Sequence, residues 1–145
     1  MDNHLDEKIA QINCLTEEVD SIYHQAALRL GVSDSVMFVL YMLYTHEGKC
    51  LLYDIYKLSG ISKQTINSAI RRLEQEDLVY LEKYNGKAKM VCLTESGAVR
   101  AEQTVARLLE AERKAFLKWN EEELRTYLIL IQKHCASLQE QIENL

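Results

Sequence analysis

The sequence contains no proline and only five glycines among its 145 residues, so little in it interrupts a helix. The abundant Leu, Glu, Lys, Ala and Gln residues favour helices over strands. With 48% hydrophobic residues, a chain of this length can bury a core without disulfides or metals. We therefore expect one mostly helical folding unit.

Long apolar runs and closely spaced cysteines are also missing. The longest nearly apolar run, residues 36–44, is much shorter than the about 20 residues that a membrane-spanning helix needs, and the amino terminus is acidic rather than basic. We therefore expect a cytoplasmic protein with no membrane partner. Without a Cys-x-x-Cys pair, neither a zinc ribbon nor a disulfide framework is indicated. We expect reduced, mostly buried thiols at Cys14, Cys50, Cys92 and Cys135.

Motifs for catalysis and metal binding are absent as well. The sequence has no Gly-rich phosphate loop, no nucleophile elbow and no His-x-x-x-His pair. Its histidines, His4, His24, His46 and His134, are scattered, so a zinc or copper site would require distant residues to converge. We expect no enzyme activity, no cofactor and no metal.

Positive charge is scarce overall and unevenly distributed. The net charge is −5, yet residues 57–93 contain seven basic and four acidic residues and carry +3, which leaves −8 for the remainder. A basic middle between acidic ends is typical of a DNA-binding protein whose other surfaces stay away from phosphate. A solvated surface of mixed charge explains the same numbers, and charge alone does not decide between the two.

Two helices are predicted first, from apolar residues spaced three and four apart. Gly31 ends a long first helix, and Ser33 is a natural N-cap for the second, which Gly48 follows. The apolar stripe of the first helix consists of Leu5, Ile9, Ile12, Val19, Tyr23, Ala26 and Leu30. The inward face of the second consists of Val36, Val39, Leu40 and Leu43.

A helix-turn-helix motif follows. A short helix over residues 52–58 leads to a sharp turn at Gly60, and Ser62 caps the next helix. The expected inward residues are Leu52, Ile55 and Leu58 in the short helix and Ile66, Ala69, Ile70 and Leu73 in the next. The polar residues left on the outer face of the second helix are Lys63, Gln64, Thr65, Asn67, Ser68, Arg71 and Arg72.

A β-hairpin is predicted next, because the apolar period changes from 3.6 to 2 at Leu78 and Asn85-Gly86 is a strong two-residue turn signal. With Tyr84 opposite Lys87, the register matches apolar with apolar residues and acid with base. The predicted cross-strand pairs are Lys83 with Ala88, Glu82 with Lys89, Leu81 with Met90, Tyr80 with Val91 and Val79 with Cys92.

Two long helices are predicted at the carboxyl-terminal end. Thr94 caps one that runs to about Lys118, and Asn120 with Glu123 forms a capping-box-like start for the last. The last helix keeps an unbroken heptad spacing at Leu124, Leu128, Ile131, Cys135, Leu138, Ile142 and Leu145. Apolar seams at both chain ends favour a two-fold homodimer, although packing within one chain explains them too. The expected interface residues are Leu5, Ile9, Ile12, Leu124, Leu128, Ile131, Leu138 and Ile142.

A family resemblance lies in residues 61–97, ISKQTINSAIRRLEQEDLVYLEKYNGKAKMVCLTESG. This segment resembles the MarR (multiple-antibiotic-resistance regulator) family of bacterial winged-helix regulators, through a short polar helix ending in RRLEQEDLV, a β-wing and the LTESG that opens a long helix. The resemblance implies a mostly α fold with a small β-hairpin wing in a single unit, residues 1–145. The winged helix-turn-helix spans residues 33–94, and dimerisation helices span residues 1–31 and 95–145.

The resemblance further implies that the dimer inserts one recognition helix per subunit into the major groove of double-stranded DNA, at a near-palindromic operator. In that helix Gln64, Asn67 and Arg71 have side chains able to pair with base edges. We assign phosphate contacts to Ser62, Lys63, Thr65, Ser68 and Arg72. A solvated helix face is the alternative for each residue.

The wing departs from the family pattern, in which a longer loop commonly carries an Asp and one or two Arg. Here the wing offers Asn85, Lys87 and Lys89. Lysine is more heavily hydrated than arginine and suits a narrow minor groove less, so we expect this wing to contact phosphate more than bases.

The family also implies a small-molecule effector pocket beside the dimer helices, although aromatic core packing explains its candidate residues equally well. The candidates are Tyr23, His24, Tyr41 and Tyr44. Some members sense peroxide through a cysteine near the amino terminus. The tyrosines that accompany that cysteine are replaced here by Leu28 and Val39, so a plain helical role fits Cys14 better.

The sequence thus predicts a sequence-specific dimeric regulator of transcription, a repressor that a small-molecule or oxidative signal releases from DNA. The alternative is a winged-helix module that binds another protein instead of a specific DNA sequence.

Overall fold

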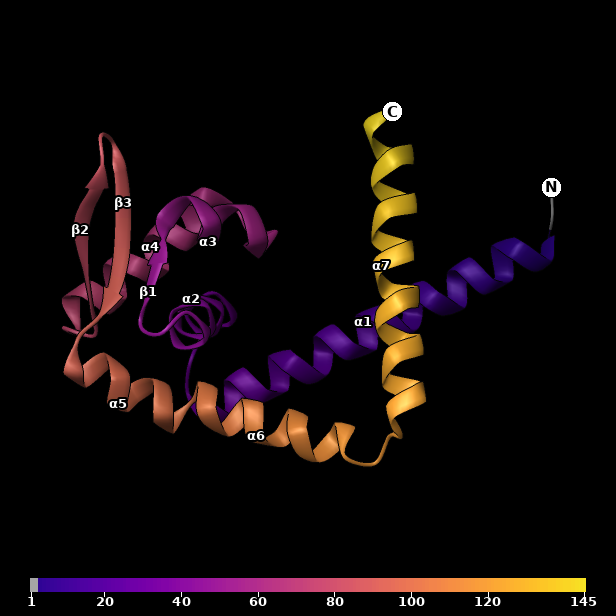
Figure 1. The fold of residues 1–145 in the computed structure, drawn as a ribbon, viewed down its shortest axis with the longest axis horizontal. Coiled ribbons are helices and arrows are strands. Elements are labelled where there is room, and N and C mark those ends of the chain that lie inside the picture. Colours follow the sequence, from indigo (N-terminus) through magenta and orange to yellow (C-terminus); the bar gives the residue numbers. More distant parts are fainter. Residues whose placement is uncertain (1–2) are drawn as a thin grey trace. The chain divides into compact units, whose positions relative to one another are not determined.

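The computed structural model describes residues 3–145, whose helices and strands are drawn in Figure 1. The chain divides into two compact units, the first ending at Leu108 and the second spanning Leu109–Leu145. The fold is mostly helical with one small sheet, as predicted. The elements are α1 (Asn3–Leu30), α2 (Asp34–Thr45), β1 (Lys49–Leu51), α3 (Leu52–Ser59), α4 (Lys63–Gln75), β2 (Val79–Asn85), β3 (Ala88–Leu93), α5 (Glu95–Gln103), α6 (Val105–Phe116) and α7 (Glu121–Glu143).

The predicted N-caps start four of these helices. The side-chain oxygens of Ser33, Ser62, Thr94 and Asn120 each accept a hydrogen bond from the backbone N–H three residues later, at 2.8 to 3.2 Å. The Glu123 carboxylate also accepts from the Asn120 N–H at 3.1 Å, which completes the predicted capping box. These bonds satisfy N–H groups that the helix itself leaves without a partner, so short-range sequence signals were sufficient to find them.

The core of the first unit is formed by α2, α3, α4 and the sheet. All predicted inward residues of α2 and α4 are buried, including Leu40, Leu43 and Ile66. In α3 the predicted Ile55 is buried, but the prediction for Leu58 is wrong, because this side chain is 61% exposed. The helix has only eight residues, and its last turn leads directly into the exposed Gly60, whose φ of +62° ends it.

The sheet is three-stranded and antiparallel in the order β1-β3-β2. Its short strand β1, absent from the sequence prediction, pairs Cys50 with Val91. The predicted hairpin exists, but its register is wrong by one residue: Leu81 lies opposite Val91, and Lys83 lies opposite Lys89. Val91 is fully buried, and the observed register places it on the same face as Leu81, whereas the predicted one would have placed it beside the exposed Tyr80.

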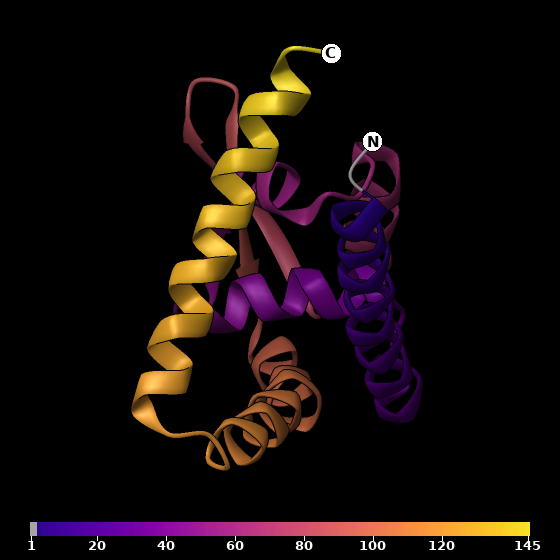
Figure 2. The ribbon, with the colours of Figure 1, turned by 90° about the vertical axis from the view of Figure 1, so that its right-hand side faces the viewer.

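The shift is absorbed at the hairpin tip. Asn85 pairs with Ala88, so Gly86 and Lys87 form the loop, with Gly86 at φ +56°, and the ladder is irregular between Lys83 and Asn85, where Tyr84 is the extra residue. The tip projects beyond α3 and α4 in both views of the molecule (Figures 1 and 2). This hairpin therefore forms an exposed wing.

The predicted continuous helix from Thr94 to about Lys118 is interrupted. Thr104 breaks it into α5 and α6, with φ −123° and ψ −78° and its hydroxyl donating to the Arg100 carbonyl at 2.8 Å. A hydroxyl side chain that bonds to the preceding turn favours such a break, and Thr104 is buried beside the core residue Val105.

The long terminal helices bury little of their apolar surface. In α1 only Ala27 is buried, and among the described residues of α7 none is. The expectation of mostly buried cysteines is correct for Cys50 and Cys92 but wrong for Cys14 and Cys135, which are exposed because they lie on these helices.

No single helix within residues 3–145 has the length and apolarity of a membrane-spanning segment. Helices α1 and α2 taken together pass a test of length and composition, but the chain bends by 87° between them.

Candidate nucleic-acid interface

Helix α4 presents a polar face opposite its buried face. Ile66, Ala69, Ile70 and Leu73 fall at helical spacing and are buried, which turns the intervening residues outward. Of the sequence-predicted contacts on this helix and its cap, Asn67 is half-buried and the others are exposed: Ser62, Lys63, Gln64, Thr65, Ser68, Arg71 and Arg72. The structure therefore brings these residues together on one surface.

Several of these side chains are already engaged within α4. The Ser62 and Thr65 hydroxyls lie 2.8 Å apart, Ser68 donates to the Gln64 carbonyl at 3.0 Å, and Arg72 pairs with Glu76 at 3.4 Å. Within residues 3–145, the side chains of Gln64 and Arg71 form no hydrogen bond or ion pair. These two side chains are thus the ones most available to an external partner.

A side chain from α3 supports the start of α4. The Tyr56 hydroxyl donates a hydrogen bond to Asn67 Oδ1, and the Lys63 ammonium lies 5.4 Å from the centroid of the Tyr56 ring. A cation over an aromatic face is held by the ring quadrupole. Tyr56 could not be predicted as part of this site, because its contact depends on the angle between two helices and no local sequence pattern indicates it.

A cavity of about 270 Å³ separates α4 from the wing. Its lining residues are Leu52, Tyr56, Asn67, Ile70, Arg71, Glu74, Leu81 and Lys89. The corrected register matters here, because it places Lys83 on the same face of the hairpin as Lys89. Arg71 of α4 and Lys89 of the wing therefore line one hollow together with Glu74, and the excess of positive charge suits a phosphate backbone.

Strand β1, which was not predicted, changes the ion-pair partner of Glu82. Glu82, predicted to pair with Lys89, instead lies 3.4 Å from Lys49 of β1, and this carboxylate raises the pKa of Lys49 above its ordinary value. Within residues 3–145, Lys89 forms no ion pair. Its charge therefore remains available beside α4, as does that of Lys87 at the exposed tip next to Asn85.

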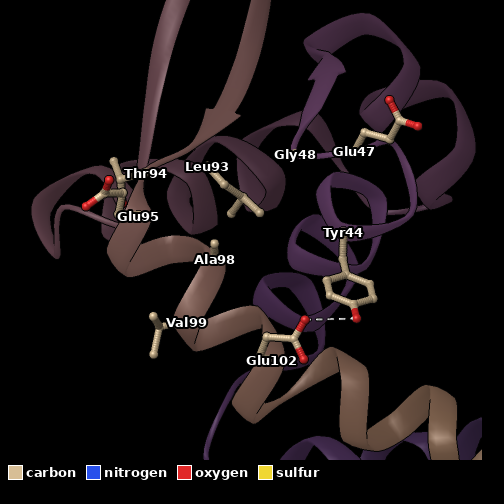
Figure 3. A pocket seen from close by; sticks show the side chains of 9 residues that line it. All are labelled: Tyr44, Glu47, Gly48, Leu93, Thr94, Glu95, Ala98, Val99 and Glu102. Carbon is tan, nitrogen blue, oxygen red and sulfur yellow. Dashed lines mark hydrogen bonds between the residues drawn. The ribbon is translucent and has the colours of Figure 1, made fainter.

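A second cavity, of about 580 Å³, lies between the end of α2 and α5 (Figure 3). Tyr44 and Glu102 face each other at one end of it, and the tyrosine hydroxyl donates to the carboxylate at 3.1 Å. Of the four predicted effector residues, only Tyr44 lines this cavity. Tyr23 and Tyr41 are exposed elsewhere, and the His24 ring hydrogen-bonds Asp34 at 2.8 Å.

The predicted dimer residues lie on the outer surfaces of α1 and α7. Leu5, Ile9 and Ile12 are exposed in α1, and Leu128, Ile131, Leu138 and Ile142 are exposed in α7, whereas Leu124 is half-buried. Exposed apolar stripes of this length are unusual on a monomer surface. No group of three or more His, Cys, Asp or Glu within residues 3–145 is arranged to hold a metal ion.

Comparisons with known proteins agree with this geometry. The MarR family model matches residues 30–84. The uncharacterized HTH-type transcriptional regulator YwhA of Bacillus subtilis is 29% identical over 133 residues, which are 90% of this chain and 92% of YwhA. The fold resembles NMB1585, a MarR family regulator from Neisseria meningitidis, with a TM-score of 0.82 and 19% identity over 98% of both chains.

The MepR protein of S. aureus, solved in complex with DNA, has a TM-score of 0.68 and 23% identity over 89% of this chain and 96% of MepR. At these identities the solved structures establish the fold, while the family match and YwhA establish relationship in sequence. The chain therefore has the winged-helix fold of MarR family regulators and matches the MarR family model over residues 30–84.

Proposed function

We propose that this protein binds double-stranded DNA as a homodimer at a near-palindromic operator, with α4 in the major groove and the wing beside the backbone. One observation carries the proposal: α4 buries its apolar face and presents a polar and basic face whose Gln64 and Arg71 have no partner within residues 3–145. The DNA complex of MepR supports the same use of this fold. Two recognition helices about one turn of DNA apart, roughly 10 base pairs, require a two-fold dimer.

Local charge supports binding to nucleic acid despite the acidic total. Residues 57–93 carry +3, and Arg71 of α4 and Lys89 of the wing line one hollow, in which Glu74 is the only acidic lining residue within residues 3–145. Because a protein that neutralises phosphates releases condensed counterions, its affinity for DNA falls as salt rises. In this proposal Gln64, Asn67 and Arg71 contact bases, while the remaining basic and hydroxyl side chains contact phosphate.

Fluorescence anisotropy with the DNA upstream of the protein's own gene, at several salt concentrations, tests this assignment. Arg71→Ala is expected to weaken binding by about 1 to 3 kcal/mol and to relax the preference at one base position. Lys87→Ala is expected to weaken binding to all sequences alike and to flatten the salt slope by about one unit.

Lys118→Ala is the matched control, because Lys118 is exposed but outside residues 57–93. Binding by Arg71→Ala and Lys87→Ala that equals binding by the control would contradict the DNA assignment. The alternative, a module that binds another protein, would then be favoured.

We also propose that DNA binding represses transcription and that a signal releases it. A small molecule in the 580 Å³ cavity beside Tyr44 would do so by binding the DNA-free conformation more tightly, by about 1.4 kcal/mol for each tenfold change in DNA occupancy. A reporter driven by the protein's own upstream DNA is expected to rise when the gene is deleted. A fall would indicate activation instead.

The oxidative version of the signal is tested separately. Hydrogen peroxide added to the protein–DNA complex is expected to release the wild-type protein, and not a Cys14→Ser/Cys135→Ser variant, if the exposed thiols are the sensors. Equal retention of DNA by both proteins would exclude these thiols and favour a small-molecule signal.

A further inference from the structure

The amide of Asn67 is held in one orientation by a residue of the preceding helix. Tyr56 lies on α3 and donates its hydroxyl hydrogen to Asn67 Oδ1. Both residues are half-buried and line the hollow between α4 and the wing. The carbonyl oxygen of the amide therefore points back toward α3, and Nδ2, which branches from the same carbon in the opposite direction, points away from it.

This orientation limits what Asn67 can offer to a base. An asparagine amide combines one acceptor with two donor hydrogens, and its bidentate pairing with adenine uses both, accepting from N6 and donating to N7. Oδ1 can accept a second hydrogen bond, but it is turned toward Tyr56 on α3, so the outward side of the amide consists of donors only. Guanine presents two acceptors, O6 and N7, and no donor in the major groove, whereas adenine places its N6 donor next to N7.

We propose that Tyr56 sets the base preference of Asn67, so that this side chain selects guanine over adenine at one position of each operator half-site. The inference rests on the DNA-binding function proposed above and deepens it. Tyr56 acts here as a positioning residue: it does not touch the base, and its effect passes through the orientation of the Asn67 amide.

The same ring also orients Lys63. The Lys63 ammonium stands 5.4 Å from the ring centroid, which keeps it near the first turn of α4. The cation–ring contact needs the aromatic ring and not the hydroxyl, so Tyr56→Phe preserves it. This substitution also preserves the side-chain volume between α3 and α4, and it removes only the hydrogen bond to Asn67.

The experiment measures the binding of the full-length protein to a panel of operators with each base substituted in turn. The wild-type protein is expected to bind guanine about tenfold more tightly than adenine at one position per half-site. In Tyr56→Phe the amide is free to turn and present Oδ1, so the ratio is expected to fall below about threefold or to invert, while affinity for the best operator changes by less than about threefold.

Two further variants separate positioning from a general loss of structure. Asn67→Ala is expected to remove the preference at the same position, and adding Tyr56→Phe to Asn67→Ala is expected to change nothing more, because the hydroxyl acts only through the amide. Tyr53→Phe is the matched control, since Tyr53 lies on the same helix and is 69% exposed.

The outcomes distinguish this inference from the function on which it rests. Specific binding with the same guanine-to-adenine ratio in the wild-type protein and Tyr56→Phe would overturn the role of Tyr56 alone. A preference for adenine by the wild-type protein at the Asn67 position would overturn the proposed amide orientation. No sequence preference at any position in the wild-type protein would overturn the proposed function together with this inference.

Discussion

Two regions of the molecule have periodic apolar residues, which are buried in one region and exposed in the other. In the winged helix-turn-helix, the apolar faces of α2 and α4 pack against each other, and the side chains of Leu40, Ile66 and Leu73 are at most 1% exposed. In α7 the heptad spacing is more regular, yet Leu128 is 61% and Ile131 41% exposed, and none of the described residues of the helix is buried. Periodicity thus identifies an apolar face, but it does not tell whether the covering surface belongs to the same chain.

The apolar surface of α7 is also wider than a single seam. Tyr127, Leu128, Ile129, Leu130 and Ile131 are consecutive and all exposed, so they point around most of the helix circumference. A two-stranded coiled coil covers only a narrow stripe, whereas a helix that is apolar on several sides is covered by several neighbours. We therefore expect the dimer to enclose the middle of α7 with more than one helix.

The largest effect, on dimerisation and DNA affinity, is expected from a charge placed in the exposed apolar face of α7. Ile131→Asp places a charge in the heptad seam, and burying an unpaired carboxylate costs several kcal/mol, so the dimer is expected to dissociate. Because two-fold DNA binding needs both recognition helices, operator affinity is expected to fall by at least about a hundredfold. Analytical ultracentrifugation measures the first effect and fluorescence anisotropy the second.

The control for Ile131→Asp is Ser137→Asp, which adds the same charge to the same exposed helix on the side away from the seam. Equal dimer stability in the two variants would show that the seam is not the interface. A wild-type protein that stays monomeric at micromolar concentration would remove the geometric basis of the proposed DNA binding.

A large decrease in the free energy of unfolding is also expected where α5 packs against the winged helix-turn-helix (together called the winged region, residues 33–103). A Cβ at Gly97 would lie 1.9 Å from the Leu78 carbonyl oxygen, and this neighbour is backbone that cannot rotate away. Gly97→Ala is therefore expected to lower the free energy of unfolding by about 2 kcal/mol or more, as measured by urea denaturation. Ser96→Ala, at the exposed neighbouring position, is the control and is expected to change it by less than about 0.5 kcal/mol.

The sequence predicted those features of the winged region that depend on neighbours along the chain. The caps at Ser33, Ser62 and Thr94 and the buried face of α4 follow from side-chain chemistry within one or two turns. The break at Thr104 was missed because a helix interior tolerates threonine, and neither proline nor glycine marks the position.

The hairpin register and Tyr56 could not be predicted because both depend on contacts between distant segments. The Asn85-Gly86 signal located the turn, but the need to bury Val91 and to pair it with Cys50 of β1 moved the register by one residue. A three-residue strand such as β1 has no period to detect. The hydrogen bond from Tyr56 to Asn67 likewise requires the crossing of α3 and α4.

The alkylation rates of the four cysteines measure the difference in burial between the two regions, and no mutation is needed. Cys50 and Cys92 are buried in the winged region, and burial raises the pKa of both thiols, which leaves less of the reactive thiolate. Alkylation by iodoacetamide at pH 8 is expected to be at least about tenfold slower at these thiols than at Cys14 on exposed α1. Mass spectrometry of peptides against time measures the rates.

Cys135 sharpens this test, because it is exposed in the single chain but occupies a heptad position of α7. Dimerisation is expected to slow its alkylation at high protein concentration, and dilution below the dissociation constant is expected to restore it, while Cys14 is unaffected. A rate at Cys135 that does not depend on protein concentration would contradict enclosure of this face.

The smallest change in the free energy of unfolding is expected at Thr94, the N-cap of α5, which also bonds to the backbone after α4. The Thr94 hydroxyl accepts from the Gly97 N–H at 2.9 Å and donates to the Asp77 carbonyl at 2.6 Å, just beyond the end of α4. Thr94→Ala removes both bonds and is expected to lower the free energy of unfolding by about 1 kcal/mol, whereas Thr94→Ser keeps both and is expected to restore most of it.

Asn120→Ala makes the matching change at the start of α7, where the cap bonds only within its own helix. If the winged region is self-sufficient, Asn120→Ala weakens dimerisation and leaves the protection of winged-region amides from hydrogen exchange unchanged, whereas Thr94→Ala lowers that protection at the end of α4. If both variants lost the same hydrogen-exchange protection in the winged region, the winged region and α7 would unfold together. The two regions would then differ in the burial of their apolar residues but not in their stability.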